Sequence, residues 1–368
     1  MLNTRNCTLF FEGKWSEEEI LGYVPSGSMI SHDHSSFPEP NAFIFGDNFE
    51  ILASLVPHYR EAFDLIYIDP PFGTGQDFSQ PEKDVAYSDD LIDHEFLAFL
   101  HKRLVLLREL LSERGTIYLH IDKKIGHYVK LIMDEVFGYQ NFINDITRIK
   151  CNPKNFSRKA YGNYSDMILV YAKKRDQQIW NEVREPLTES EVKKLFPKIH
   201  PEKGRYTTHP LHAPGETING DTGQEWKGLF PPKGRHWRYS REELSKLDNE
   251  GLIEWSSKGN PRKMVFAKEH PGKKVQDVWT FKDKGMSYVS YPTEKNHDLL
   301  QRIIQHSSHP DSLVLDAFAG SGGTLINASR LGRKWVGIDQ SEEAKVVIEE
   351  NMEKEGIVYR SLLFLAEE

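Results

Sequence analysis

The sequence predicts an α/β fold with a largely parallel sheet and a ligand site at one edge of that sheet. The apolar run Phe63–Ile68 leads into Asp69-Pro70-Pro71-Phe72, and a second apolar run, 312–315, leads into Asp316-Ala317-Phe318-Ala319-Gly320-Ser321-Gly322. Each segment is typical of a buried strand that ends in a sharp turn, and open α/β sheets bind their ligands at such turns. We therefore expect the two turns to form the halves of one pocket.

Regular elements are predicted from Asn41 onward. Residues 94–112 have the pattern of a long amphipathic helix, and we expect Gly115 to end it, as glycine commonly does at a helix C-terminus. The apolar face of this helix comprises Phe96, Leu97, Leu100, Leu104, Leu107 and Leu111. The other elements predicted in this part of the chain are strands at Ala42–Phe45, 64–68, 116–121, Phe142–Ile149 and 167–171, and helices at 48–55 and 124–137, the latter closed by Gly138.

The pattern changes after Lys173, where Pro, Gly, Trp, Lys and Arg become frequent and helical patches are short. One such patch is 240–247, in which Ser240 and Glu243 have the spacing of a capping box. The α/β pattern then returns as helices at 299–305, 323–331 and 341–354 and strands at 313–315 and 335–338. We therefore divide the chain into an amino-terminal extension (1–40), a first α/β half (41–175), an insertion (176–285) and a second α/β half (286–368).

Composition excludes several classes of protein. The 368 residues are 38% hydrophobic, which is enough to bury a sizeable core. No apolar run is long enough to span a membrane and the first residues lack a signal-peptide pattern, so we expect a cytoplasmic protein without membrane partners. Cys7 and Cys151 lack metal-ligand spacing, so no metal site is expected.

The net charge of −8 disfavours nucleic-acid binding by bulk electrostatics, so any such binding must come from local patches. One patch contains Arg148, Lys150, Lys154, Arg158 and Lys159, and a second lies between Lys227 and Lys274. Aromatic residues, including Trp226, Trp237 and Trp255, are interleaved with the second patch, and rings can stack on bases while cations bind phosphates. The residues expected to contact DNA are Arg158, Lys159, Arg235, Arg238, Arg262 and Lys263.

With these motifs the chain resembles the beta group of amino-methylating DNA methyltransferases, which includes Type II and Type III modification methylases. In that family a D/N/S-P-P-Y/F motif binds the target base and an F-x-G-x-G motif binds S-adenosyl-L-methionine. Here the base motif comes first and the cofactor motif last, which is the permuted order of the beta group. The resemblance implies a Rossmann-like, circularly permuted methyltransferase fold with an inserted target-recognition region.

The glycine turn suits a cofactor because Gly320 and Gly322 have no Cβ to obstruct a ligand. Asp339 ends the next predicted strand, where an acid can accept hydrogen bonds from ribose hydroxyls, although it could instead cap the following helix. By resemblance, 291–296 corresponds to the P-T-[EQ]-K-P segment and Gly46-Asp47-Asn48 to the acidic turn that binds the cofactor's adenine. The implied cofactor residues are Asp47, Pro292, Thr293, Lys295, Asp316, Phe318, Gly320, Ser321, Gly322, Thr324 and Asp339.

The base motif has a chemical rationale in the same family. The Asp69 carboxylate and the Pro70 carbonyl can accept hydrogen bonds from an exocyclic amine, while Pro70 and Pro71 restrict the backbone and Phe72 offers a face for an extruded base. Neither cysteine follows a proline, as C5-cytosine methylation would require. An acid at the first motif position favours N6 of adenine, and N4 of cytosine stays open as the alternative.

Other interpretations remain at this point. Asn163-Tyr164-Ser165-Asp166 resembles a family segment that flanks the flipped base, and Leu119-His120-Ile121-Asp122 borders the same edge, where His120 could be structural and Asp122 a helix cap. Related motifs also serve RNA and protein amine methyltransferases, and a non-catalytic DNA-binding subunit could use the same fold. The expected partner is double-stranded DNA, with a second copy of the chain and a restriction subunit as further candidates.

Overall fold

A computed structural model describes residues 8–31, 40–71, 94–153, 159–283 and 295–366. The chain forms two compact units, one built from Met1–Val183 and Gln276–Glu368 and the other from Arg184–Val275. The second unit is thus narrower than the insertion expected at 176–285. Residues 176–183 and 276–283 of the expected insertion belong to the first unit instead. Residues 278–280, for example, pair with the main sheet. Phe72, Arg158, Pro292 and Thr293 lie outside the described residues.

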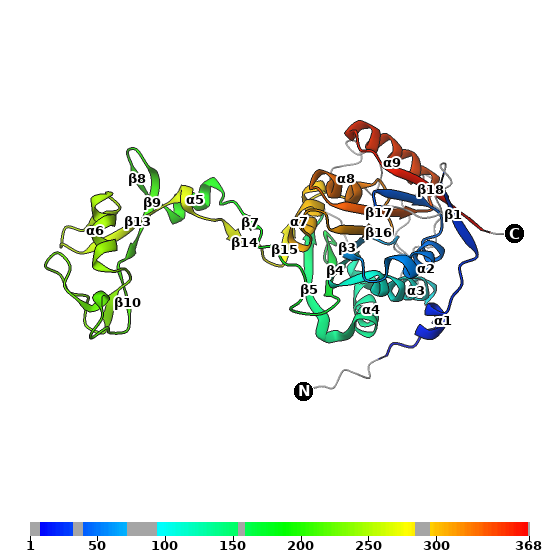
Figure 1. The fold of residues 1–368 in the computed structure, drawn as a ribbon, viewed down its shortest axis with the longest axis horizontal. Helices are drawn as coiled ribbons and strands as arrows, with labels where there is room; N and C mark the ends of the chain where they lie inside the picture. Colours follow the sequence, from blue (N-terminus) through cyan, green and yellow to red (C-terminus); the bar gives the residue numbers. More distant parts are fainter. Residues whose placement is uncertain (1–7, 32–39, 72–93, 154–158, 284–294, 367–368) are drawn as a thin grey trace. The chain divides into compact units, whose positions relative to one another are not determined.

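The first unit contains a ten-stranded sheet in the order β1-β18-β2-β17-β16-β3-β4-β6-β5-β15 (Figure 1). Neighbouring strands from β18 to β4 are parallel, whereas β6 is antiparallel to both β4 and β5. The strands are β1 (Gly27–Ser31), β2 (Ala42–Phe45), β3 (Phe63–Ile68), β4 (Leu111–Ile121), β5 (Phe142–Ile149), β6 (Ser165–Ala172), β15 (Val278–Thr280), β16 (Leu313–Asp316), β17 (Lys334–Asp339) and β18 (Arg360–Ala366).

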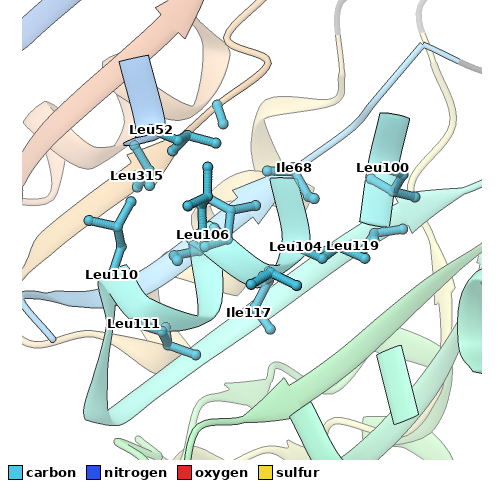
Figure 2. Close-up of a cluster of buried hydrophobic side chains, with 14 of the residues drawn as sticks. Leu52, Ile68, Leu100, Leu104, Leu106, Leu110, Leu111, Ile117, Leu119 and Leu315 are labelled. Atoms are coloured by element: carbon cyan, nitrogen blue, oxygen red, sulfur yellow. The ribbon is translucent and has the colours of Figure 1, made fainter. Parts of the chain in front are cut away.

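Helices cover both faces of this sheet, with α2, α3 and α4 on one side and α7, α8 and α9 on the other (Figure 1). Their bounds are α1 (Glu17–Leu21), α2 (Asn48–Tyr59), α3 (His94–Leu110), α4 (Lys123–Met133), α7 (His297–Ser307), α8 (Gly323–Arg330) and α9 (Glu342–Glu355), and a π-helical turn, Asp134–Gly138, follows α4. Leucines of α3 pack with Leu52 of α2, Ile68 of β3 and Leu315 of β16 (Figure 2). The apolar core therefore joins segments from both ends of the chain.

Two local predictions were wrong. The helix α3 ends at Leu110, and β4 starts at once, so Gly115 lies within a strand and does not end the helix. A Cβ on Gly115 would come within 2.8 Å of the Phe63 carbonyl oxygen, so close packing between strands explains the glycine. The lack of clear periodicity in residues 1–40 predicts a loosely packed arm, and this was wrong for the described part, because β1 pairs with β18 and Ile20 of α1 is buried.

The second unit has a small core of its own, formed by Leu211, Trp226, Trp237, Leu244 and Ile253. Ser240 and Glu243 make the predicted capping box at the start of α6, which confirms that element. The unit contains β7 (Arg184–Glu185), α5 (Glu189–Leu195), β8 (Lys198–His200), β9 (Gly204–Pro210), β10 (His212–Pro214), β11 (Arg235–Trp237), α6 (Arg241–Asn249), β12 (Ile253–Trp255), β13 (Pro261–Phe266) and β14 (Lys273–Lys274). Its strands form the sheets β12-β13-β9-β8, β10-β11 and β14-β7.

Within the part of the chain that the structure describes, none of the helices is long and apolar enough to cross a membrane.

Candidate active site

The two predicted turns lie side by side at one edge of the sheet. Strand β16 pairs in parallel with β3 on one side and with β17 on the other, so their carboxyl ends meet. Asp316 ends β16, Asp69 follows β3 directly, and Asp339 ends β17. Three carboxylates from segments distant in sequence therefore converge where a doubly wound sheet binds its ligand.

Backbone amides hold the glycine turn in place. The amide of Phe318 donates to Asp316 Oδ1 at 3.0 Å, and the amide of Gly320 donates to Asp339 Oδ2 at 2.8 Å. Gly320 has φ of 52° and Gly322 has φ of 78°, a backbone region that glycine adopts without strain. Ser341, not Asp339, caps α9, so Asp339 is not the helix cap that the sequence left as an alternative.

Asp316 is the most enclosed acid of the site, with 2% of its surface exposed. Burial raises the pKa of this carboxyl to about 7, with the nearby charges of Asp69 and Asp339 acting in the same direction. Hydrogen bonds from the Thr324 hydroxyl and the Phe318 amide partly offset that shift of the pKa. Thr324 is itself buried and bonded to Asp316, so in this structure it orients the carboxyl group.

Asp47 connects the start of α2 to a buried arginine. Its carboxylate caps α2 through the amides of Phe49 and Glu50, and it accepts a hydrogen bond from Arg103 Nη2 at 3.0 Å. Arg103 also bonds to the side chain of Asn48, and Asn48 Nδ2 donates to the carbonyl of Ala317 at 2.7 Å. The acidic turn and the glycine turn are thus held together by Asn48 and Arg103. Arg103 was not predicted, because an arginine within a helix pattern carries no sequence signal for this contact, whereas Asn48 belongs to the acidic turn that the sequence indicated.

A cavity of about 490 Å³ adjoins Asp47. Arg103 at its wall is 4% exposed, and burial lowers the pKa of its guanidinium to about 10. The lining includes aromatic rings, cations and two residues of the amino-terminal segment: Glu12, Gly13, Asp47, Phe49, His94, Glu95, Ala98, Phe99, Lys102 and Arg103. The amino-terminal segment therefore forms part of the wall of this cavity, which the sequence alone did not indicate.

Asp69 has one paired and one unpaired oxygen. Lys295 forms an ion pair with its Oδ2, whereas its Oδ1 is buried and has no hydrogen-bond partner among the described residues. A buried acceptor without a donor is costly, and in native proteins it commonly marks a binding or catalytic position. Lys295 was expected to contact the cofactor, and the structure places its ammonium against the base motif.

A second polar group surrounds the ends of β4, β5 and β6. His120 is fully buried and its Nδ1 lies 2.9 Å from the Tyr67 hydroxyl, while Asp122 caps α4. Arg148 was placed in a basic surface patch by its sequence position, and this was wrong, because its side chain is fully buried beside Asp166. Lys159 of the same patch is exposed.

The second unit gathers several of the predicted DNA-contacting cations. Burial is the main cause that lowers the pKa of His212, and the positive charges of Arg235, Arg238 and Arg262 lower it further. The three arginines therefore lie around one histidine. Arg235 and Arg238 are exposed, whereas Arg262 bonds to Thr208 and is half-buried.

Two of the rings expected to stack on bases serve the core instead, since Trp226 and Trp237 are buried. Lys263 is also engaged within the second unit, because its ammonium donates to the Tyr239 hydroxyl at 3.0 Å. Within the second unit, Arg235 and Arg238 are therefore the predicted DNA-contacting residues that are exposed.

Comparison with known proteins identifies the family. The model of a DNA methylase family, N6_N4_Mtase, matches residues 63–350. The chain belongs to this DNA methylase family. It is 41% identical to the Type II methyltransferase M.EcaI of Enterobacter cloacae over 91% of the methylase and 75% of the relative. Members of the family take their methyl group from S-adenosyl-L-methionine, which is the cofactor of the methylase.

Two further proteins are more distant. The methylase is 28% identical to the StyLTI Mod subunit, a Type III restriction-modification enzyme of Salmonella typhimurium, over 77% of the methylase but only 49% of that relative. The solved structure of an M1.HpyAVI-SAM complex matches 84% of the methylase and 98% of that chain, with 16% identity and a TM-score of 0.46. The methylase thus spans about half the length of the StyLTI subunit.

Proposed function

We propose that the methylase transfers a methyl group to N6 of adenine at specific sites in double-stranded DNA. The observation that carries this proposal is the unpartnered, buried Oδ1 of Asp69 at the edge where the glycine turn also lies. An exocyclic amine supplies the donors that this carboxylate lacks. Because a base within a duplex cannot reach a buried carboxylate, the adenine must be extruded from the helix.

The chain's own residues account for the chemistry of the amine. Asp69 and the carbonyl of Pro70 accept hydrogen bonds from the two N–H groups, which favours a pyramidal nitrogen with an available lone pair. Held at the glycine turn, S-adenosyl-L-methionine would offer its methyl carbon to this lone pair, with its sulfur as the leaving atom that keeps the bonding electrons. We assign to Asp69 the role of taking the proton that the nitrogen releases. No covalent enzyme intermediate is needed, so positioning supplies much of the rate.

Described residues around the glycine turn fit the cofactor. S-adenosyl-L-methionine supplies an electrophilic methyl group when it is bound. The exposed part of the Asp47 carboxylate faces a cavity with aromatic walls, which suits the adenosine portion, and Asp339 lies next to the backbone of Gly320. We assign Asp47, Asp339 and the backbone of Gly320-Ser321-Gly322 to cofactor binding.

DNA recognition is assigned to the second unit. Arg235 and Arg238 are exposed beside His212, and arginine commonly reads guanine through two hydrogen bonds in the major groove. Arg262 and Lys263 border this cluster and support it through Thr208 and Tyr239.

The deciding experiment is methyl transfer from labelled S-adenosyl-L-methionine to duplex DNA, followed by nucleoside analysis. We expect N6-methyladenine at a defined set of sites. N4-methylcytosine as the product would overturn the adenine assignment. Cofactor binding without transfer to any duplex would overturn the catalytic assignment and favour a non-catalytic DNA-binding subunit.

A further inference from the structure

A chain of polar contacts runs from β3 to the end of β15 beneath the base motif. The hydroxyl of Tyr67 lies 2.9 Å from His120 Nδ1, and His120 Nε2 lies 3.1 Å from Asp166 Oδ2. The same carboxylate oxygen lies 3.3 Å from Arg148 Nη1. The residues come from the carboxyl ends of β3, β4 and β5 and from the start of β6, which are four neighbouring strands of one sheet.

The chain of contacts continues into the segment that returns from the second unit. Arg148 Nε donates to the carbonyl of Phe281 at 2.9 Å, and its Nη2 forms an ion pair with Asp283. Lys150 adds a further positive charge, since its ammonium lies 3.9 Å from Asp166 and 3.6 Å from Asp122. His120, Arg148 and Lys150 therefore surround the single buried carboxylate of Asp166. Tyr67 and the segment after β15 lie one contact further out.

Stability alone is a weak reason for this arrangement. Tyr67, His120, Asp166 and Arg148 are all nearly inaccessible to solvent, and removing charges from water commonly costs as much as pairing them returns. Well-packed apolar residues of similar volume would often stabilise a fold equally well. A buried polar network does, however, restrict side-chain geometry more strictly than apolar packing, because hydrogen bonds are directional.

The network begins next to the proposed catalytic carboxylate. Tyr67 is the last residue but one of β3, and Asp69 follows the strand directly, so the two residues are separated only by Ile68. The remaining oxygen of Asp166, Oδ1, is buried without a hydrogen-bond partner among the described residues, as is Oδ1 of Asp69. One of these unpaired acceptors thus belongs to the contact chain, and the other lies two residues beyond Tyr67 along the backbone.

We propose that Tyr67, His120 and Asp166 are positioning residues that set the geometry of Asp69 and Pro70 for methyl transfer. This inference rests on the proposed function and extends it to residues that do not touch the reacting atoms. The Asp166 carboxylate faces His120 Nε2 at 3.1 Å without a hydrogen bond of regular geometry, so it acts on that side of the ring through its charge, while Nδ1 contacts the Tyr67 hydroxyl at 2.9 Å. The contact with His120 fixes the position of the Tyr67 hydroxyl, and thereby restrains the carboxyl end of β3.

The test is Tyr67→Phe, which removes one hydroxyl and keeps the ring. Its matched control is Tyr118→Phe, because Tyr118 is equally buried, pairs in register with Tyr67, and bonds through its hydroxyl to Ser307 of α7 at 2.7 Å. Since small misplacements of reacting groups can cost up to about 100-fold in rate, we expect Tyr67→Phe to lower kcat by roughly tenfold or more. Its KM for S-adenosyl-L-methionine and its melting temperature should match those of Tyr118→Phe, whose kcat should stay within about twofold of wild type.

Asp166→Asn provides the second arm, because it keeps the shape of the side chain and removes its charge. If Tyr67 and Asp166 act through one contact chain, the kcat of the double variant should be about equal to that of the less active single variant. Independent, multiplying losses would overturn the inference, as would equal kcat for Tyr67→Phe and Tyr118→Phe. The wild-type enzyme is assayed on the same DNA as a control. An inactive wild type would contradict the proposed function itself, whereas an active wild type lets the variants test the positioning role alone.

Discussion

The ammonium of Lys295 forms an ion pair with the carboxylate of Asp69, so the two motifs that flank the site share a charge pair. Both side chains are mostly buried, at 18% and 16% exposure. Lys295 belongs to the segment 291–296, which resembles the P-T-[EQ]-K-P segment of the cofactor half, whereas Asp69 belongs to the base motif. The pair therefore links residues that the sequence assigned to different halves of the pocket.

Asp69→Ala should abolish methyl transfer while cofactor affinity stays within a few fold of wild type. The carboxylate acts on the amine in the transition state, and its loss should fall on kcat. Single-turnover transfer and a calorimetric cofactor titration on the same preparation test this. Substantial turnover by the variant would rule out the proposed mechanism.

Lys295→Gln should lower kcat by about tenfold or more and change cofactor affinity by less than about threefold, because its partner is the base-site carboxylate. The measurement is kcat and KM for each substrate, with direct cofactor binding as a second readout. Preserved kcat with weakened cofactor binding would contradict this prediction and support the cofactor contact that the sequence indicated for Lys295.

Gly320→Val should weaken cofactor binding by at least about tenfold, or 1.4 kcal/mol, because a side chain would enter the turn that is proposed to admit the ligand. Gly332→Val is the matched control. Gly332 also has positive φ, at 73°, and no atom of the described residues lies within 4 Å of the position that a Cβ would take there. Equal cofactor affinity in the two variants would show that the glycine turn has been misassigned.

The raised pKa of Asp316, about 7, gives a pH dependence of stability. A carboxyl group whose pKa is higher in the folded than in the unfolded protein favours folding while it is protonated. Its contribution is complete below the unfolded-state pKa and is lost progressively as the pH rises from that value to the folded-state pKa. We expect wild type to lose stability relative to Asp316→Asn between about pH 4 and pH 7.

Melting temperatures of the two proteins across this range provide the measurement for Asp316. The pKa of Asp339 is raised as well, but that residue is present in both proteins, so the difference isolates Asp316. Parallel profiles would contradict the assignment of a protonated, buried Asp316.

Arg235→Ala and Arg238→Ala should each weaken DNA binding without changing cofactor binding by the free enzyme. A lost bidentate contact to guanine costs about 1 to 3 kcal/mol of discrimination, so at least one variant should also relax site preference. Arg262→Ala should in addition lower the melting temperature, because Arg262 bonds to Thr208. DNA affinity, the set of methylated sites and the melting temperature are measured on the same preparations.

Lys193→Ala is the control for the arginine variants, since it removes an exposed cation that already pairs with Glu189 in α5. Well-folded arginine variants with wild-type DNA affinity and unchanged sites would place recognition outside this cluster, for instance in the basic segment 152–163.

Much of the fold was predictable from local pattern. Buried parallel strands are continuous apolar runs, so Ala42–Phe45 was predicted with the bounds that the structure has. Phe142–Ile149 was also predicted with its observed bounds, although this strand is largely half-buried or exposed and antiparallel to β6. The capping box at Ser240 was equally local. The prediction for Gly115 was wrong because a glycine required for close strand packing looks the same in sequence as one that ends a helix.

By itself the sequence determined the two motifs, their order and the α/β pattern around them, because these depend on neighbouring residues and on periodicity. Only the tertiary structure decided which distant side chains meet. Arg103 reaches Asp47, Lys295 pairs with Asp69, and Arg148 is buried beside Asp166 although its sequence neighbours suggest a basic surface. The physical reason is that the partners of a charge, and its burial, are set by how strands far apart in the chain are ordered in the sheet.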